Sequence, residues 1–483
     1  MDITIGKYTL ETLTSGMYDS PKDFYREYIQ NCVDSIDNAI EMNVISQEES
    51  NVEIVISKTD SKIVILDNGT GISTQKALKL ILDIGNSSKR NTRERGFRGI
   101  GRLAGLAYCG TLSFETSAIG EDKKTIIVFD GNRLRKQLSN SDYDIDLQMI
   151  MANIVETKTE PDKKSNHYFK VTMENVSDID NILDFSSVCD YLSQIAPAKF
   201  SEEYRWGKMI NAKMSHSGVD IASYNIKVSD DEQKKLIRKS YADSFISDRL
   251  RKVQDSILDI EIVRFEFENE LLGVLWYAKT NCFGTVNDVK TKGIRMRKGN
   301  IQLGARNTLN NIFKDDRFNG WLIGELHIVS NRLIPNARRD GLEKNDCYDI
   351  LLSQLCEWAN NVSNDIRKIS IARNKDKKIL EAIKHENVNQ EQVAVLEASV
   401  EPEIAVSLKS ENEDVVHSEI INMIDTMLLN RNACTKYKAL NVQSDITIDQ
   451  KVILEKVFDI ICLTDTTVAD KMVANIIRGF AIK

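Results

Sequence analysis

The most informative pattern of apolar and polar positions lies near the N-terminus, between residues 24 and 37. The apolar residues of this stretch and the turn after it are Ile29, Cys32, Val33, Ile36 and Ile40. They fall mostly on one side of a helix, and the other side carries Glu27, Asn31 and Asp34 at positions i, i+4 and i+7. Such a helix buries its apolar back and turns a carboxylate, an amide and a second carboxylate toward a cavity. These three residues are therefore candidates for a catalytic base and a metal ligand.

A second pattern is an apolar strand that ends in an acid and two glycines. Residues 63–66 read Ile-Val-Ile-Leu and are followed by Asp67, Gly69 and Gly71. A carboxylate at the end of a buried strand needs a hydrogen-bond donor, and a purine amino group is a suitable one. The glycines allow a tight turn and the close approach of a flat ring. This segment therefore predicts a nucleobase site.

A third segment, residues 96–105, is rich in glycine and contains an apolar stretch at 103–106 that we expect to be helical. Backbone N–H groups in such a loop and at a helix start bind anions. The loop does not follow a strand inside a βαβ unit, and no Gly-Lys-Ser/Thr is present. Neither a Rossmann site nor a Walker site is therefore expected.

The remaining pattern predicts strands and helices in mixed order. Strands are expected at residues 110–116, 124–129, 168–173, 260–267, 271–277 and 321–329. The two strands at 260–277 should form a hairpin, residues 185–218 a helical connection, and the chain from residue 346 onward further helices.

These elements predict an α+β protein in three parts. Residues 1–182 would form a two-layer α/β sandwich, in which helices cover one face of a mixed sheet. Residues 183–345 would form a second α+β domain, and residues 346–483 a helical region for dimerisation or partner binding.

The order of the first three segments resembles that of a known superfamily. A Glu/Asn/Asp helix, then Asp-x-Gly-x-Gly, then a glycine-rich lid is the arrangement of the GHKL ATPases, which include gyrase, heat-shock-protein-90, histidine kinases and MutL. The resemblance covers about residues 1 to 180 and implies the Bergerat-type ATP-binding fold, followed by a transducer-like domain. Histidine kinases normally lack a glutamate at the position of Glu27, so its presence favours ATP hydrolysis over phosphorylation of a partner.

The resemblance also implies a role for each matching residue. Glu27 would be the general base, Asn31 the only protein ligand of Mg²⁺, and Asp67 the acceptor of the adenine amino group. A magnesium ion that keeps most of its water ligands agrees with a single protein ligand. The other residues that would bind ATP are Asp34 on the helix, Gly69 and Gly71 near the base, and Ser88, Lys89, Gly96, Gly99 and Gly101 in the lid.

One element departs from the superfamily pattern. Relatives usually carry a Gly-Thr pair at the start of a later strand, whereas this chain has Asn166-His167 before the strand expected at 168–173. Nucleotide binding is therefore better supported than a preference for adenine. We expect His167 to be a surface residue at the start of its strand.

A second block of resemblance lies at residues 336–342, which align with the segment that carries an arginine to the ATP γ-phosphate in heat-shock chaperones. Arg339 occupies the place of that arginine, and a guanidinium there would stabilise charge on the phosphoryl oxygens. Lys298 is the rival, because other members of the superfamily use a lysine of the second domain for this task.

Composition limits the class of protein. The chain has 483 residues, enough for about three domains, and a net charge of −8. Its apolar stretches are far shorter than the roughly 20 residues of a membrane span, and no signal sequence is expected, so we predict a cytoplasmic protein without a membrane partner. The scattered cysteines are expected to be reduced, mostly buried thiols and not zinc ligands. They are Cys32, Cys109, Cys189, Cys282, Cys347, Cys356, Cys434 and Cys462.

Three functions remain open. The first is an ATP-hydrolysing clamp that forms a homodimer when ATP closes the lid, as in heat-shock chaperones and MORC proteins. The second is a nucleic-acid-handling ATPase, as in MORC proteins or MutL, with a role in bacterial genome or phage defence, although the net negative charge weighs against non-specific DNA binding. The third is a scaffold that binds ATP without hydrolysing it. The basic residues behind the second hypothesis are Lys89, Arg90, Arg93, Arg95, Arg98 and Arg102 in the lid, and Lys290, Lys292, Arg295, Arg297 and Lys298 in the second domain.

Overall fold

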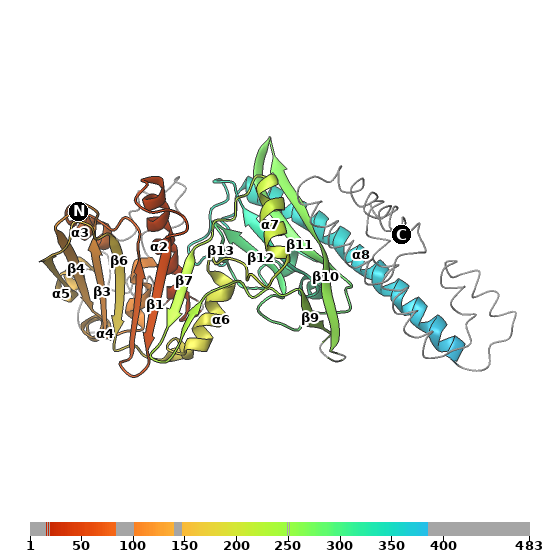
Figure 1. Cartoon of the computed structure of the whole chain (residues 1–483), viewed down its shortest axis with the longest axis horizontal. Helices are drawn as coiled ribbons and strands as arrows, with labels where there is room; N and C mark the ends of the chain where they lie inside the picture. Colours follow the sequence, from red (N-terminus) through yellow and green to blue (C-terminus); the bar gives the residue numbers. More distant parts are fainter. Residues whose placement is uncertain are drawn as a thin grey trace, which may run out of the picture. The chain divides into compact units, whose positions relative to one another are not determined.

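The computed structural model describes residues 16, 18, 20–83, 101–139, 147–248, 250 and 252–384, without the side chains of 375–384. The chain divides into two compact units, residues 1–364 and residues 365–483. The first unit contains both sheets of the structure (Figure 1), and the expected α+β class is confirmed.

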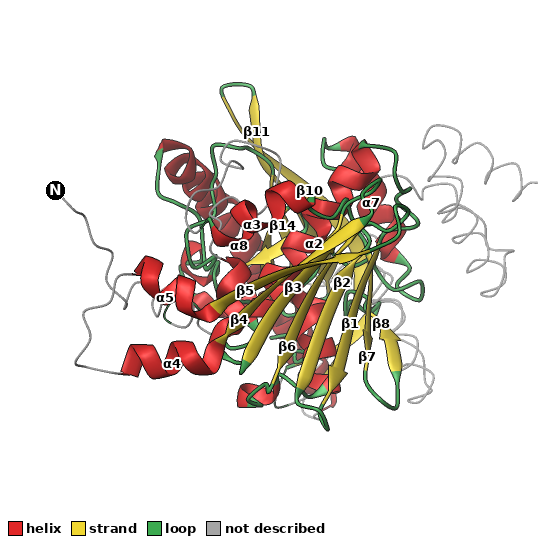
Figure 2. Cartoon of the chain, turned by 90° about the vertical axis from the view of Figure 1, so that its left-hand side faces the viewer, coloured by secondary structure: helices red, strands yellow, loops and turns green. Residues whose placement is uncertain are grey.

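The N-terminal sheet has the strand order β5-β4-β3-β6-β2-β1-β7-β8. Its strands are β1 (Asn51–Ser57), β2 (Lys62–Asp67), β3 (Thr111–Ser117), β4 (Lys123–Asp130), β5 (Val155–Pro161), β6 (Tyr168–Glu174), β7 (Asn225–Ser229) and β8 (Lys234–Leu236). All neighbours are antiparallel except β1 and β7, which are parallel. Figure 2 shows these strands side by side. Strand β2 alternates as its sequence predicts, because Ile63, Ile65 and Asp67 are buried and the residues between them are less so.

Helices pack against this sheet and complete the predicted sandwich. They are α2 (Asp23–Glu41), α3 (Thr74–Leu82), α4 (Gly131–Ser139), α5 (Leu147–Ile154) and α6 (Phe185–Ile195), with the short 3₁₀ helices η1 (Gly101–Ala107) and η2 (Ile179–Asn181). Helix α2 packs on β1 and β2, and its apolar residues Ile29, Val33 and Ile36 are fully buried in the core. The predicted N-terminal helix is therefore confirmed, and its apolar back lies where the pattern places it.

Strands β7 and β8 lie beyond residue 182, the boundary expected for the first domain. They nevertheless belong to the N-terminal sheet, because β7 pairs with β1 over Asn51–Val55 and β8 pairs with β7. The division expected at residue 182 therefore does not coincide with the edge of this sheet. A short strand that pairs in parallel with a distant one gives no local signal of its partner.

The second sheet has the strand order β13-β12-β14-β11-β10-β9. Its strands are β9 (Ser244–Ser247), β10 (Val253–Phe267), β11 (Glu270–Thr280), β12 (Gly293–Lys298), β13 (Ile301–Leu303) and β14 (Ile323–Ile328), with the 3₁₀ helices η3 (Asn310–Ile312) and η4 (Asp316–Trp321). Strands β10 and β11 form the hairpin expected at 260–277. Helix α7 (Trp206–His216) packs on both of them through an apolar cluster that includes Ile210 and Trp276.

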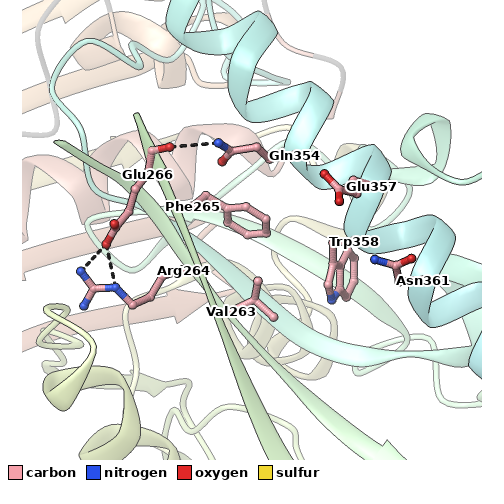
Figure 3. Close-up of a pocket in the computed structure, with 8 residues that line it drawn as sticks. All are labelled: Val263, Arg264, Phe265, Glu266, Gln354, Glu357, Trp358 and Asn361. Atoms are coloured by element: carbon pink, nitrogen blue, oxygen red, sulfur yellow. Dashed lines mark hydrogen bonds and ion pairs between the residues drawn. The ribbon is translucent and has the colours of Figure 1, made fainter. Parts of the chain in front are cut away.

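Helix α8 (Asp346–Lys384) begins against the second sheet. The ring of Trp358 lies 5.4 Å from that of Tyr277 and 5.9 Å from that of Phe313, measured between centroids. A groove of about 580 Å³ separates β10 from this part of α8 (Figure 3). The amide of Gln354 donates across one end of the groove to the Glu266 carbonyl, at 2.9 Å. None of the predicted site residues lines this groove.

A buried ion cluster joins the second sheet to the N-terminal part of the unit. The carboxylate of Glu325, on β14, lies 2.7 Å from Lys239 Nζ and 2.6 Å from Arg297 Nε. Lys239 follows β8, and Arg297 also donates to the Gln194 carbonyl near the end of α6, at 2.6 Å. The two cations hold the pKa of Glu325 well below its ordinary value, while burial lowers that of Lys239 to about 7. One carboxylate therefore holds together segments that are far apart in the sequence.

Candidate functional site

Helix α2 carries the three residues of the predicted polar stripe. Glu27 and Asp34 are buried, with 7% and 2% of their surface exposed, and Asn31 between them is partly exposed. Two carboxylates buried this deeply are costly unless other groups compensate their charge. The surroundings of Glu27 show what compensates it.

The end of the glycine-rich segment lies directly on Glu27. A Cβ atom at Gly101 would stand 2.0 Å from Glu27 Oε2, so the backbone of this glycine lies close against the Glu27 carboxylate. Tyr28 fixes the same segment, because its hydroxyl donates to the Arg102 carbonyl at 3.1 Å and accepts from the Gly105 N–H at 3.0 Å. The helix expected at 103–106 is the 3₁₀ helix η1. The structure thus brings Glu27 and Gly101 together.

Arg339 reaches the same carboxylate from the other side. Its Nε lies 2.8 Å from Glu27 Oε1, and the side chains of Arg339 and Glu27 are 12% and 9% exposed. Arg339 stands in a turn closed by the bridge between Pro335 and Leu342, and its backbone is left-handed, with φ of +58°. The Arg339 carbonyl accepts from the Gly304 N–H at 2.7 Å, which ties this turn to the second sheet. Among the described residues, the cation paired with Glu27 is therefore an arginine about 300 residues further along the chain.

Arg26 adds a second link between α2 and this turn. Its guanidinium donates to the Arg338 carbonyl at 3.4 Å and lies 3.5 Å from Asp23 Oδ1. The side chain of Arg338 is exposed. Of the two adjacent arginines, only Arg339 therefore presents its charge to Glu27.

Lys298, the rival of Arg339, is engaged elsewhere. Its ammonium group donates to the Ser330 carbonyl at 2.6 Å and to the Val329 carbonyl at 3.4 Å, beyond the end of β14. Burial lowers the pKa of Lys298 to about 8.

Asp67 ends β2 at the other end of the candidate site and is 2% exposed. Its Oδ1 accepts from the Gly69 N–H at 2.8 Å, whereas Oδ2 is buried without a hydrogen-bond partner among the described residues. Burial raises the pKa of Asp67 to about 7, and neighbouring donor groups, the Gly69 N–H foremost, act in the opposite direction. A buried carboxylate oxygen without a donor fits a ligand that supplies one, and the adenine amino group is such a donor.

His167 directly precedes β6 and is partly exposed. Its Nδ1 lies 2.8 Å from the Gly69 carbonyl oxygen, in the turn that follows Asp67. Nothing in the sequence near residue 167 indicates this contact, which arises because β6 pairs with β2. Arg26 and Tyr28 were missed for a related reason, since both stand beside Glu27 on α2 but contact segments distant in sequence.

The predicted lid residues Ser88, Lys89, Gly96 and Gly99 lie outside the described residues, as do Arg90, Arg93, Arg95 and Arg98. Of the five basic residues that the nucleic-acid hypothesis names in the second domain, Arg295 and Arg297 are buried. The Arg295 side chain is 2% exposed and binds a backbone carbonyl and Gln302. Arg297 is 1% exposed and binds a backbone carbonyl and Glu325. Lys290 pairs with Asp190 at 2.7 Å. Buried cations that are already paired cannot neutralise DNA phosphates.

The N-terminal part thus holds a buried acid on a helix, a glycine close against it, and an acid at a strand end before a glycine turn. Residues 25–163 match the family described as histidine kinase-, DNA gyrase B- and HSP90-like ATPase. The matched residues of this ATPase domain include Glu27, Asn31, Asp34, Asp67, Gly69, Gly71 and Gly101. His167, Lys298 and Arg339 lie beyond them. No curated protein sequence matches the chain.

Two further findings concern the part of the chain that the structure describes. No helix there combines the length and apolar character that a bilayer span requires. No cluster of three or more His, Cys, Asp or Glu side chains suited to a metal ion occurs among those residues. The role of Asn31 as a ligand of Mg²⁺ stays a prediction. The six cysteines of the described part are free thiols, and five of them are buried.

Proposed function

We propose that the chain hydrolyses ATP and works as an ATP-gated conformational clamp, in which the second sheet responds to the γ-phosphate. The observation that carries this proposal is the 2.8 Å ion pair between Glu27 of the ATPase domain and Arg339 of the turn tied to the second sheet. It supports a direct link between the residue suited to activate water and a segment outside the domain.

Glu27 is the general base in this proposal. A base must stand within hydrogen-bond reach of the water it activates, and the contacts to Gly101 and Arg339 hold the Glu27 carboxylate in one place. Asn31 stands one helical turn further along the same face and would hold Mg²⁺, which supplies charge neutralisation on the phosphates when bound. Asp67, with its unpartnered oxygen, would accept the adenine amino group at the far end.

Arg339 makes the clamp respond to ATP, because Glu27 and the γ-phosphate compete for its guanidinium. Without nucleotide its guanidinium is paired with the Glu27 carboxylate, which ties the Arg339 turn to α2. The γ-phosphate carries more negative charge than a carboxylate and offers several acceptor oxygens, so it competes for the same guanidinium. Release of Glu27 and movement of the Arg339 turn would then be one event. ADP has no γ-phosphate and leaves the pair closed.

Steady-state ATP hydrolysis tests this proposal against its alternatives. The wild-type chain is measured with and without duplex DNA, and nucleotide binding is followed by calorimetry. Turnover without DNA, together with dimerisation on a non-hydrolysable ATP analogue in sedimentation experiments, supports the clamp. Turnover that requires DNA would favour a nucleic-acid-handling ATPase, and tight binding without turnover would leave an ATP-dependent scaffold.

A further inference from the structure

The glycine turn after β2 is held by three neighbouring elements. The Gly69 N–H donates to Asp67 Oδ1 at 2.8 Å. The Thr70 N–H donates to the Ser35 carbonyl on α2 at 3.2 Å, and the Ile72 N–H donates to Thr116 Oγ1 on β3 at 2.8 Å. The third element is β6, whose flanking residue His167 binds the turn through its side chain.

The turn has no free space around its two glycines. A Cβ atom at Gly69 would stand 2.1 Å from Ser35 Oγ, and one at Gly71 would stand 1.9 Å from the Ser117 carbonyl oxygen. Gly71 also has a left-handed backbone, with φ of +63°. The turn is therefore closely packed against α2 and β3, and the Gly69 peptide meets Asp67 through its N–H.

His167 and Asp67 fix the two polar groups of the same glycine. The Gly69 N–H points to Asp67 Oδ1, and the Gly69 carbonyl lies 2.8 Å from His167 Nδ1. A carbonyl oxygen can only accept, so His167 must carry its proton on Nδ1. Because Asp67 and Phe169 are partners in the β2–β6 register, His167 stands two residues from the strand partner of Asp67.

We propose that His167 is a positioning residue for the nucleobase. Its Nδ1–H holds the Gly69 carbonyl, which keeps the Gly69 N–H on Asp67 Oδ1 and thereby aims Oδ2 at the adenine amino group. This inference rests on the proposed function, because it needs a nucleotide at Asp67. Guanine carries a carbonyl oxygen where adenine carries its amino group, so a correctly aimed carboxylate binds adenine and repels guanine. His167 therefore supports both affinity for adenine nucleotides and discrimination against guanine nucleotides.

The test compares His167→Ala and His167→Asn with the wild-type full chain. Loss of one neutral hydrogen bond should weaken ADP binding by about threefold to tenfold. The ratio of ADP to GDP affinity should fall by a similar factor, while kcat at saturating ATP stays near that of the wild type. The asparagine amide introduced by His167→Asn places an N–H close to the position of Nδ1, so this variant should restore most of the affinity and the discrimination. His216→Ala, at the exposed end of α7, is the control and should change neither.

Three results would overturn the inference alone. They are wild-type ADP affinity and nucleobase preference in a folded His167→Ala chain, an asparagine variant no better than the alanine variant, and equal weakening of ADP and GDP binding. Wild-type protein that binds no adenine nucleotide would overturn the proposed function and this inference with it. Thermal melting without nucleotide checks that both His167 variants are folded, and a variant that weakens ADP and GDP equally would show a merely structural role.

Discussion

Replacement of Arg339 by alanine is the most direct test of the link between Glu27 and the second sheet. The ion pair has its charged atoms 2.8 Å apart, with side-chain exposures of 12% and 9%. Two unit charges at this distance attract each other by about 6 kcal/mol at an effective dielectric constant of about 20. Desolvation of both groups cancels much of this energy, so we expect a net coupling of about 1 to 3 kcal/mol.

A double-mutant cycle measures that coupling. The free energy of unfolding is determined in denaturant, without nucleotide, for the wild type, Glu27→Ala, Arg339→Ala and the double variant. Each single change removes one charge from the pair, and the double variant removes both. The two single changes should together cost more stability than the double change, by the coupling energy. A coupling below about 0.5 kcal/mol would mean that the ion pair does not hold α2 to the Arg339 turn.

Hydrolysis gives the second measurement. If Arg339 also stabilises charge on the γ-phosphate, Arg339→Ala should lower kcat by about 100-fold to 1,000-fold and leave ADP affinity unchanged, because charge-stabilising donors are worth about 3 to 4 kcal/mol. Arg338→Ala is the matched control. Its side chain is exposed, and alanine keeps the backbone carbonyl that accepts from Arg26, so kcat should stay within about threefold.

The outcome that refutes the reasoning is equally specific. Near-normal kcat in Arg339→Ala, combined with a large loss in Lys298→Ala, would assign the γ-phosphate to Lys298. That result would require Lys298 to leave the Val329 and Ser330 carbonyls when ATP binds.

Three other predictions follow from the site and the ion cluster. Glu27→Ala should bind ATP with near-normal affinity in calorimetry and lose turnover by about 100-fold to 10,000-fold, and retained turnover would remove Glu27 from the mechanism. Asp67→Asn should abolish ATP binding yet stabilise the nucleotide-free protein at about pH 8 by up to about 4 kcal/mol, the equivalent of a pKa shift of about three units. Burial raises the folded-state pKa of Asp67 to about 7, above about 3.9 in the unfolded chain. Ionisation of Asp67 therefore lowers the stability of the wild type as pH rises from about 4 to about 7. The stability gained by Asp67→Asn should vanish near about pH 4 in denaturant titrations. Glu325→Gln should lower the free energy of unfolding by about 3–5 kcal/mol because it leaves Lys239 and Arg297 buried without their anion, whereas Glu266→Gln, which breaks a half-exposed pair with Arg264, should change it by less than about 0.5 kcal/mol.

Short-range pattern was enough to predict the ATPase domain's local structure. The 3.6-residue period of α2 placed Glu27, Asn31 and Asp34 on one face, and the alternation of β2 placed Asp67 at its buried end. These periods depend only on neighbouring residues, so one sequence contains them in full. The hairpin of β10 and β11 was predicted for the same reason, since its strands are adjacent in the chain.

What the sequence left open depends on contacts between distant segments. The parallel pairing of β7 with β1 moved residues 225–236 into the first sheet, and a boundary drawn from local pattern could not include it. Basic residues near Lys298 suggested a nucleic-acid partner, but the fold buries Arg295 and Arg297, and Arg297 pairs with Glu325.

The site itself shows the same division. Sequence alone supplied Glu27, Asp67 and the glycines, and it left Arg339 and Lys298 as rivals because either could be brought to the same point. Only the tertiary structure showed that the Arg339 guanidinium pairs with the Glu27 carboxylate and that His167 Nδ1 contacts the Gly69 carbonyl. Both contacts join segments about 100 or more residues apart, where the position of each side chain is set by how the sheets and helices pack and not by its neighbours in the chain.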